Sequence, residues 1–182
     1  MRSSSLFALV LCLVPTAFAQ DGVTPAWQLQ STLDALASHA KRLPPLLDQV
    51  KAADWVKEGA SATYAEQSQS ARNEIEYLTR AAAALAAKPE SLTRALEAYL
   101  KLETVETLLD SLSEGVRRYQ NPALADLILG VLAENAANRS RLRNYLTELV
   151  ANKEVELRIM NEEAQRCRGL IFSQPRSPAK KK

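Results

Sequence analysis

The sequence predicts an all-α protein, an antiparallel up-down bundle of about four helices in which a very long C-terminal helix projects beyond the bundle. Residues that favour helices, chiefly Ala, Leu, Glu and Arg, are abundant, while the chain holds only 5 Gly and 5% aromatic residues. Apolar residues recur at alternating steps of three and four, the period of one face of a helix. Prolines mark the breaks between these patterns, and the short connections that result favour antiparallel neighbours.

Residues 1–19 are predicted to be a cleaved signal peptide. Arg2 supplies a positive N-terminus, residues 6–14 form an apolar run that Pro15 ends, and residues 17–19 (Ala-Phe-Ala) fit the A-x-A cleavage pattern. The run is about half of the ~20 residues that a membrane-spanning helix needs. We therefore expect an exported protein, either periplasmic or secreted. The expected organisation is a signal peptide over 1–19, a helical bundle domain over 20–172 and a disordered basic tail over 173–182.

The excess of basic over acidic residues lies in the C-terminal tail and not on the body of the protein. Arg176, Lys180, Lys181 and Lys182 follow Pro175 without any acidic residue, and the rest of the expected mature chain holds 18 basic against 21 acidic residues. A body with a net charge of −3 argues against binding of nucleic acid, which requires a basic stripe. We expect the tail to make at most a weak electrostatic contact with an anionic envelope surface.

Three helices are expected before the long one, over 25–42, 61–88 and 89–118. Pro44 and Pro45 are expected to end the first of them, because proline disfavours helical backbone in the residue before it. The segment 43–60 then forms a structured corner that Gly59 closes. Pro89 is expected at the first position of the third helix, where a missing N–H costs nothing.

The longest predicted helix covers 121–172, about 50 residues or roughly 75 Å. It accompanies its shorter neighbours only as far as residue 150, so residues 151–172 are expected to project about 30 Å past the bundle unless the helix bends. The projecting part keeps an apolar stripe, and such a stripe needs a partner in water. The candidate self-association residues in this stripe are Leu157, Met160, Ala164, Cys167 and Ile171.

Cys167 is the only cysteine that remains once a signal peptide containing Cys12 is removed. It therefore has no partner for an internal disulfide. It is either a buried small apolar residue or one half of an intermolecular bridge.

Three asparagines, Asn135, Asn138 and Asn152, fall on or beside the apolar register of the longest helix. A buried asparagine weakens a helix seam but can fix its register or the number of chains, or make a polar contact with a ligand between helices. The alternative is that the helix rotates locally and turns the amides of Asn135 and Asn138 to water. This second arrangement is the one we expect.

An aromatic and basic corner formed by Trp55, Arg117, Arg118 and Tyr119 is the candidate recognition surface. An up-down order brings the 43–60 segment to the same end of the bundle as the start of the long helix. The alternative is structural. The two arginines then stabilise the C-terminal end of their helix, and the two aromatic rings close the core.

Neither catalysis nor metal binding is predicted, and no cofactor is expected. His39 is the single histidine, and the chain lacks the Glu-x-x-His pattern typical of di-metal bundles. Glu103, Glu106 and Asp110 share one helix face, which is typical of a solvated helix surface. Only a carboxylate with a strongly perturbed pKa inside a large polar pocket would indicate an enzyme.

The function expected from these patterns is that of an exported, non-enzymatic interaction or scaffold module of the cell envelope, which self-associates through its long last helix. Its partners are then proteins, including a second copy of itself. The alternative is a holdase-type periplasmic chaperone or a binder of apolar ligands, which rests on an analogy of architecture.

Overall fold

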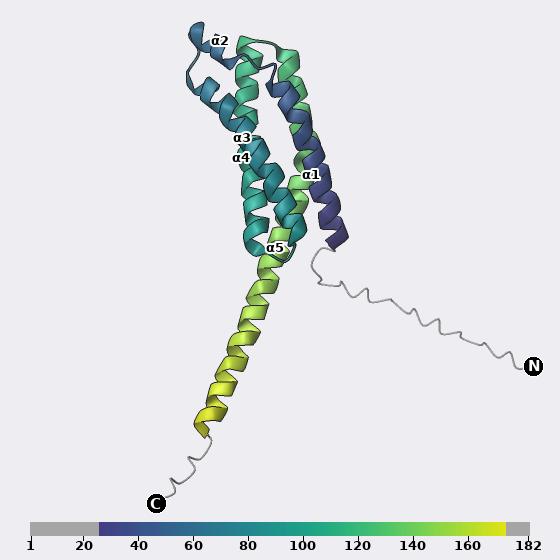
Figure 1. The fold of residues 1–182 in the computed structure, drawn as a ribbon, viewed down its shortest axis with the longest axis vertical. Helices are drawn as coiled ribbons and strands as arrows, with labels where there is room; N and C mark the ends of the chain where they lie inside the picture. The colour runs from purple at the N-terminus through teal and green to yellow at the C-terminus, as the bar shows by residue number, and fades with distance from the viewer. Residues whose placement is uncertain (1–25, 174–182) are drawn as a thin grey trace, which may run out of the picture.

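The computed structural model describes residues 26–173, and this part of the chain contains five helices and no strand. The all-α prediction is therefore confirmed for these residues (Figure 1). The predicted signal peptide and residues 174–182 of the predicted tail lie outside the described residues. The helices are α1 (Ala26–Leu47), α2 (Ala52–Lys57), α3 (Thr63–Ala87), α4 (Leu92–Tyr119) and α5 (Pro122–Ser173).

Four of the helices form a closed antiparallel ring. Helix α1 packs against α3 and α5, and α4 packs against the same two helices. The chain runs up, down, up and down through α1, α3, α4 and α5, while the short α2 lies at the end where α4 finishes (Figure 1). The predicted up-down topology is confirmed, since neighbours in sequence are neighbours in space.

The core is built from the residues that the three-and-four pattern marks as apolar. Each long helix contributes a fully buried leucine to this core. These four leucines, each 1% exposed or less, are Leu36, Leu85, Leu109 and Leu142. Side chains at these steps lie on one face of a helix, so four such faces meet around the bundle axis. Full burial of a side chain of this size contributes about 1.5–3 kcal/mol to folding.

Helix α1 continues through Pro44 and Pro45 to Leu47, so the prediction that these prolines end it is wrong. Both proline rings are exposed, while Leu43 and Leu47 on the other face are 3% and 0% exposed. The prolines remove two intrahelical hydrogen bonds, and the burial of the two leucines offsets that loss. Arg72 of α3 also holds the end of the helix, because its guanidinium donates to the Leu47 carbonyl at 2.5 Å.

Helix α4 begins at Leu92, three residues later than predicted from Pro89. Ser91 precedes the helix with an extended backbone at φ −83° and ψ 106°. The Pro89 carbonyl accepts a hydrogen bond from the Tyr145 hydroxyl of α5 at 2.5 Å. The tertiary contact with α5 thus fixes residues 88–91 as a turn.

Helix α5 extends over 52 residues, about 78 Å, without interruption. Its first part packs in the bundle, and its last part continues alone as a rod (Figure 1). Every residue from 154 to 172 is exposed. The prediction of a long helix that projects beyond the bundle is confirmed, and the projection, residues 151–173, does not fold back.

Among the described residues, none of the helices is both long and apolar enough to cross a membrane.

Candidate functional site

The projection of α5 carries most of the large apolar side chains that the described part of the protein exposes. Val155, Leu157, Ile159, Met160, Leu170, Ile171 and Phe172 lie on it, against four on the rest of the described chain, Tyr77, Leu96, Leu100 and Leu127. Scattered apolar residues are normal on a surface, whereas a concentration on one element indicates an interaction site.

The five candidate self-association residues all lie on this projection and are all exposed. Leu157 and Met160 are each 65% exposed, and Ile171 is 70% exposed. Cys167 is exposed and carries a free thiol. Cys167 is therefore not buried within a single copy, and the thiol lies on the apolar stripe.

The stripe continues the line of the bundle core. Met160 follows the buried Leu142 by 18 residues, and Cys167 follows the buried Leu149 by the same number. Eighteen residues are about five turns of an α-helix, so the paired side chains point to the same side of α5. The side of α5 that faces α1 and α4 inside the bundle therefore faces water below it.

Asn135 and Asn138 are buried in the seam of α5, at 6% and 4% exposed. The expectation that both amides face water is wrong. The Asn138 amide donates to the side-chain oxygen of Asn135 at 3.2 Å, and His39 Nδ1 of α1 lies 3.3 Å from the same oxygen. Because Asn138 finds a partner one turn away on α5 and Asn135 finds one on α1, both amides are satisfied inside the bundle and the helix has no need to rotate. Asn152, the third residue of the predicted polar seam, is half-buried at the end of the bundle.

The Asn135 oxygen is the shared acceptor of this small network. Replacing Asn135 with leucine removes the partner of both Asn138 and His39, and a buried polar group left without a partner costs about 1–3 kcal/mol. We expect Asn135→Leu to lower the free energy of unfolding by that amount in urea titrations. Asn135→Leu with Asn138→Leu is expected to recover only the part of the loss that comes from the unpaired Asn138 amide, since His39 still lacks its partner. A double variant no more stable than the single one would contradict this account.

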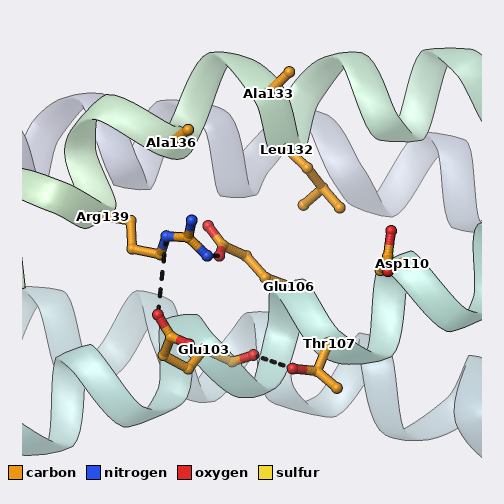
Figure 2. Close-up of a pocket in the computed structure, with 8 residues that line it drawn as sticks. All are labelled: Glu103, Glu106, Thr107, Asp110, Leu132, Ala133, Ala136 and Arg139. Atoms are coloured by element: carbon orange, nitrogen blue, oxygen red, sulfur yellow. Dashed lines mark hydrogen bonds and ion pairs between the residues drawn. The ribbon is translucent and has the colours of Figure 1, made fainter.

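A polar groove of about 350 Å³ lies between α4 and α5 (Figure 2). Arg139 of α5 reaches across it, with Nη1 2.7 Å from the Glu106 carboxylate and Nε 3.9 Å from that of Glu103. The Glu106 side chain is only 13% exposed, so its charge is largely removed from water. The predicted solvated face of Glu103, Glu106 and Asp110 is thus in part a wall of this groove. Its lining is Glu103, Glu106, Thr107, Asp110, Leu132, Ala133, Ala136 and Arg139.

Burial raises the pKa of Glu106, the negative charge of Glu103 adds to the rise, and Arg139 opposes it. A raised pKa means that the folded state holds the proton more tightly than the unfolded state does. Ionisation of Glu106 therefore lowers the stability of the folded state as the pH rises past the ordinary pKa of a glutamate towards neutrality.

We expect Glu106→Gln to gain stability relative to the wild type as the pH rises from about 4 to 7, because glutamine has no charge to bury. The measurement is the urea midpoint of both proteins at several pH values. Glu114→Gln, an exposed position on the same helix, is the matched control for the loss of one negative charge. A difference between wild type and Glu106→Gln that does not change with pH would contradict the expectation.

The aromatic part of the candidate recognition corner is not on the surface. Trp55 is 2% exposed, and its ring stacks on that of the half-buried Tyr119 at 6.1 Å between centroids. Tyr64 completes the cluster at 5.9 Å from Trp55 and 5.8 Å from Tyr119. The structural alternative, in which the rings close the core, is confirmed for Trp55, and an exposed Trp55 is wrong.

Gly115 makes this aromatic cluster possible. A Cβ atom there would lie 2.7 Å from Cε1 of Tyr64 and 3.1 Å from Cζ3 of Trp55. Both rings are held in place by their neighbours, so no side chain fits on α4 at this position.

The two arginines of the same corner, Arg117 and Arg118, are exposed at the end of α4. Arg117 forms an ion pair with Asp126 at 2.5 Å, and the Arg118 guanidinium lies over the Tyr119 ring at 5.3 Å. Arg117 therefore joins the ends of α4 and α5, and Arg118 covers an aromatic ring, contacts that differ from the stabilisation of the end of α4 that the structural alternative predicts.

His39 and Cys167 lie far apart. His39 contacts Asn135, and Cys167 follows Asn135 by 32 residues on α5, about 48 Å along the helix axis. His39 instead faces Glu134 at 3.8 Å, beside the Arg42 side chain that also binds Glu134. Among the described residues, no group of three or more His, Cys, Asp or Glu is arranged to hold a metal ion.

The fold and the site together define an all-α bundle with one projecting, apolar-striped helix. Comparison of the chain with protein-family models, with curated proteins and with solved structures finds no match. The function is therefore argued from the chemistry of the site.

Proposed function

We propose that this protein is an exported, non-enzymatic interaction module that associates with a second copy of itself through the projection of α5. The observation that carries the proposal is the apolar stripe of that projection, where Leu157, Met160 and Ile171 remain 65–70% exposed. Apolar area of this kind is costly in water and is removed from it by a partner helix.

The expected strength of this association is modest. Burying a side chain of this size contributes about 1.5–3 kcal/mol when burial is complete. If three such side chains in each of two copies each gain two-thirds of that value, the dimer gains roughly 6–12 kcal/mol. Association itself costs about 4–15 kcal/mol in lost translational and rotational freedom. At the favourable ends of both ranges the net gain is about 8 kcal/mol, which corresponds to a Kd of about 1 μM. A weak, reversible complex at micromolar or higher concentrations is therefore the strongest association that these three side chains support.

Export and the absence of catalysis are part of the proposal. Export is supported by the composition of residues 1–19, which resembles a signal peptide. A non-enzymatic role is supported by the separation of His39 from Cys167 and by the ion pair that one carboxylate oxygen of Glu106 forms with Arg139. We also propose that protein, not nucleic acid, is the partner, in view of the acidic body, and that the basic tail adds only weak adhesion to an anionic surface.

A holdase-type chaperone would use the same stripe for unfolded clients. Binding of an apolar ligand inside the bundle has less support, because the cavity lined by Leu36, Val105 and Val131 measures only about 10 Å³. A water molecule just fits such a volume.

Light scattering of the chain over a range of concentrations, with and without reductant, tests the proposal. Cys12→Ser is used as the background so that Cys167 is the only thiol. A molar mass that rises with concentration to that of a dimer or a larger species, and survives reductant, supports association through the helix. A dimer lost on reduction assigns the contact to Cys167 alone, and a monomer under all conditions overturns the proposal.

A further inference from the structure

We infer that two projections pair antiparallel, with residues 151–173 of one copy along residues 151–173 of the other, so that the two bundles lie at opposite ends of a shared two-helix rod. The inference rests on the proposed self-association and specifies the partner, its direction and its register.

The direction follows from where the stripe points. The last part of α5 extends beyond the end of the bundle (Figure 1). Because the stripe continues the core side of α5, a partner helix on the stripe would lie in line with the space that the bundle occupies. A parallel partner would continue upwards into the space that α1 and α4 already occupy against α5. The α5 helix of an antiparallel partner approaches from the opposite direction and ends at the bundle, so that the partner's own bundle lies at the far end of the rod.

The register follows from the heptad and from the length of the projection. Leu157, Met160, Ala164, Cys167 and Ile171 follow steps of three and four, the spacing of a two-stranded seam. One antiparallel register sets Leu157 opposite Cys167 and Met160 opposite Ala164, and it brings residue 151 level with residue 173 of the partner. A shift of one heptad either drives the last seven residues of the partner's α5 into the end of the bundle or leaves seven residues of each projection unpaired.

The side chains across this seam are complementary in size. Each copy sets the long Met160 against the small Ala164 of its partner and Leu157 against the small Cys167. Since the pair has twofold symmetry, both contacts occur twice.

The charges beside the seam favour the same direction. In the antiparallel pair, Glu154 of each copy lies near Arg168 of the other copy, so this favourable contact occurs twice. Among the positions that flank the seam, the one contact between like charges is that of Glu163 with Glu163 of the other copy. In a parallel pair Glu163 would instead lie beside Arg168. Whether a substitution at Glu163 strengthens or weakens the dimer therefore depends on whether the two helices pair antiparallel or parallel.

Disulfide trapping in the full chain with Cys12→Ser tests the inference. In the antiparallel register Cys167 lies about 15 Å from Cys167 of the partner, beyond the 4.4–6.8 Å that a disulfide spans between Cα atoms. Mild oxidation is expected to leave this parent protein uncrosslinked. Leu157→Cys is expected to produce a covalent dimer, because residue 157 faces Cys167 of the partner.

Arg158→Cys is the matched control. It lies at the same height on the helix but on the opposite face, away from the stripe, and is expected to give no covalent dimer. Leu157→Cys combined with Cys167→Ser is also expected to give none, since residue 157 faces residue 167 and not itself. A covalent dimer of the parent through Cys167 alone, or of the combined variant, would establish a parallel pair and overturn the inference.

The dissociation constant of the Glu163→Gln dimer provides a second test that needs no cysteine chemistry. This substitution is expected to tighten the dimer about twofold, since it removes a like-charge contact, whereas a parallel pair would be weakened. A dimer by light scattering that Leu157→Cys fails to trap overturns the antiparallel register but leaves self-association standing. A monomer at every concentration overturns both.

Discussion

Replacing Leu157 and Met160 together with lysine is expected to leave the protein monomeric at concentrations where the wild type associates. Both side chains are 65% exposed in the single copy and central to the stripe. Two lysines per helix would place four ammonium groups against an apolar partner, where desolvation of a charge costs more than the stripe gains. The measurement is molar mass by light scattering.

The matched control carries the same change of net charge on the far face of the helix. Glu162→Gln with Gln165→Lys removes one negative and adds one positive charge, so it also raises the net charge by two, and both residues are exposed on the face opposite the stripe. This control is expected to associate like the wild type. Since all four positions lie on the projection, neither variant should change the thermal stability of the bundle. An unchanged molar mass for Leu157→Lys with Met160→Lys would refute association through the stripe.

The same lysine variant separates the two functions that use the stripe. An interaction module that pairs with itself is expected to leave the aggregation of an unfolded client unchanged at near-stoichiometric ratio. A holdase is expected to suppress that aggregation and to lose the effect with the two lysines. The aggregation of the client, measured at increasing amounts of this protein, distinguishes the interaction module from the holdase.

Replacing Trp55 with alanine is expected to have the largest effect on folding stability. The ring is 2% exposed and packs against Tyr64 and Tyr119. Removal of a buried Trp side chain costs about 3–5 kcal/mol, because it leaves a cavity that its neighbours fill only in part. For a domain of this size the melting temperature falls by roughly 2–4 °C per kcal/mol, so a decrease of at least about 6 °C is expected by differential scanning calorimetry.

Tyr77→Ala is the control, since Tyr77 is an aromatic residue 46% exposed on α3. It loses its cation–π contacts with Arg80 and Lys101, which at an exposed site are each worth about 0.5–1 kcal/mol. If Trp55→Ala changed the melting temperature no more than Tyr77→Ala does, Trp55 would not be part of the core, and the recognition corner would have to be reconsidered.

The prolines show where local rules stop predicting the fold. Pro44 and Pro45 disfavour a helix locally, yet α1 continues to Leu47 because Leu47 is buried against the bundle and Arg72 binds its carbonyl. Pro89 favours a helix start, yet Tyr145 holds its carbonyl in a turn. In both places the deciding partner lies 25 or more positions away in the sequence, so no local pattern could reveal it.

The asparagines show the same limit in the site. The heptad placed Asn135 and Asn138 in the seam, but an amide is stable there only with partners. Those partners are His39 on another helix and the second amide one turn away. The sequence does show a single histidine beside an apolar stripe and two asparagines three residues apart. Whether these side chains contact one another depends on how α1 lies along α5.

By itself, the sequence determined the all-α class, the up-down order of the helices and the length of α5, because apolar spacing and short connections are local properties. It also determined that residues 151–172 carry a stripe without neighbours in the bundle, since the shorter helices cannot reach them. The tertiary structure alone decided that Trp55 closes the core, that Glu106 is buried beside Arg139, and that the stripe faces the same side as the core. These are relations between helices, and they depend on the rotation of each helix about its axis, which packing determines.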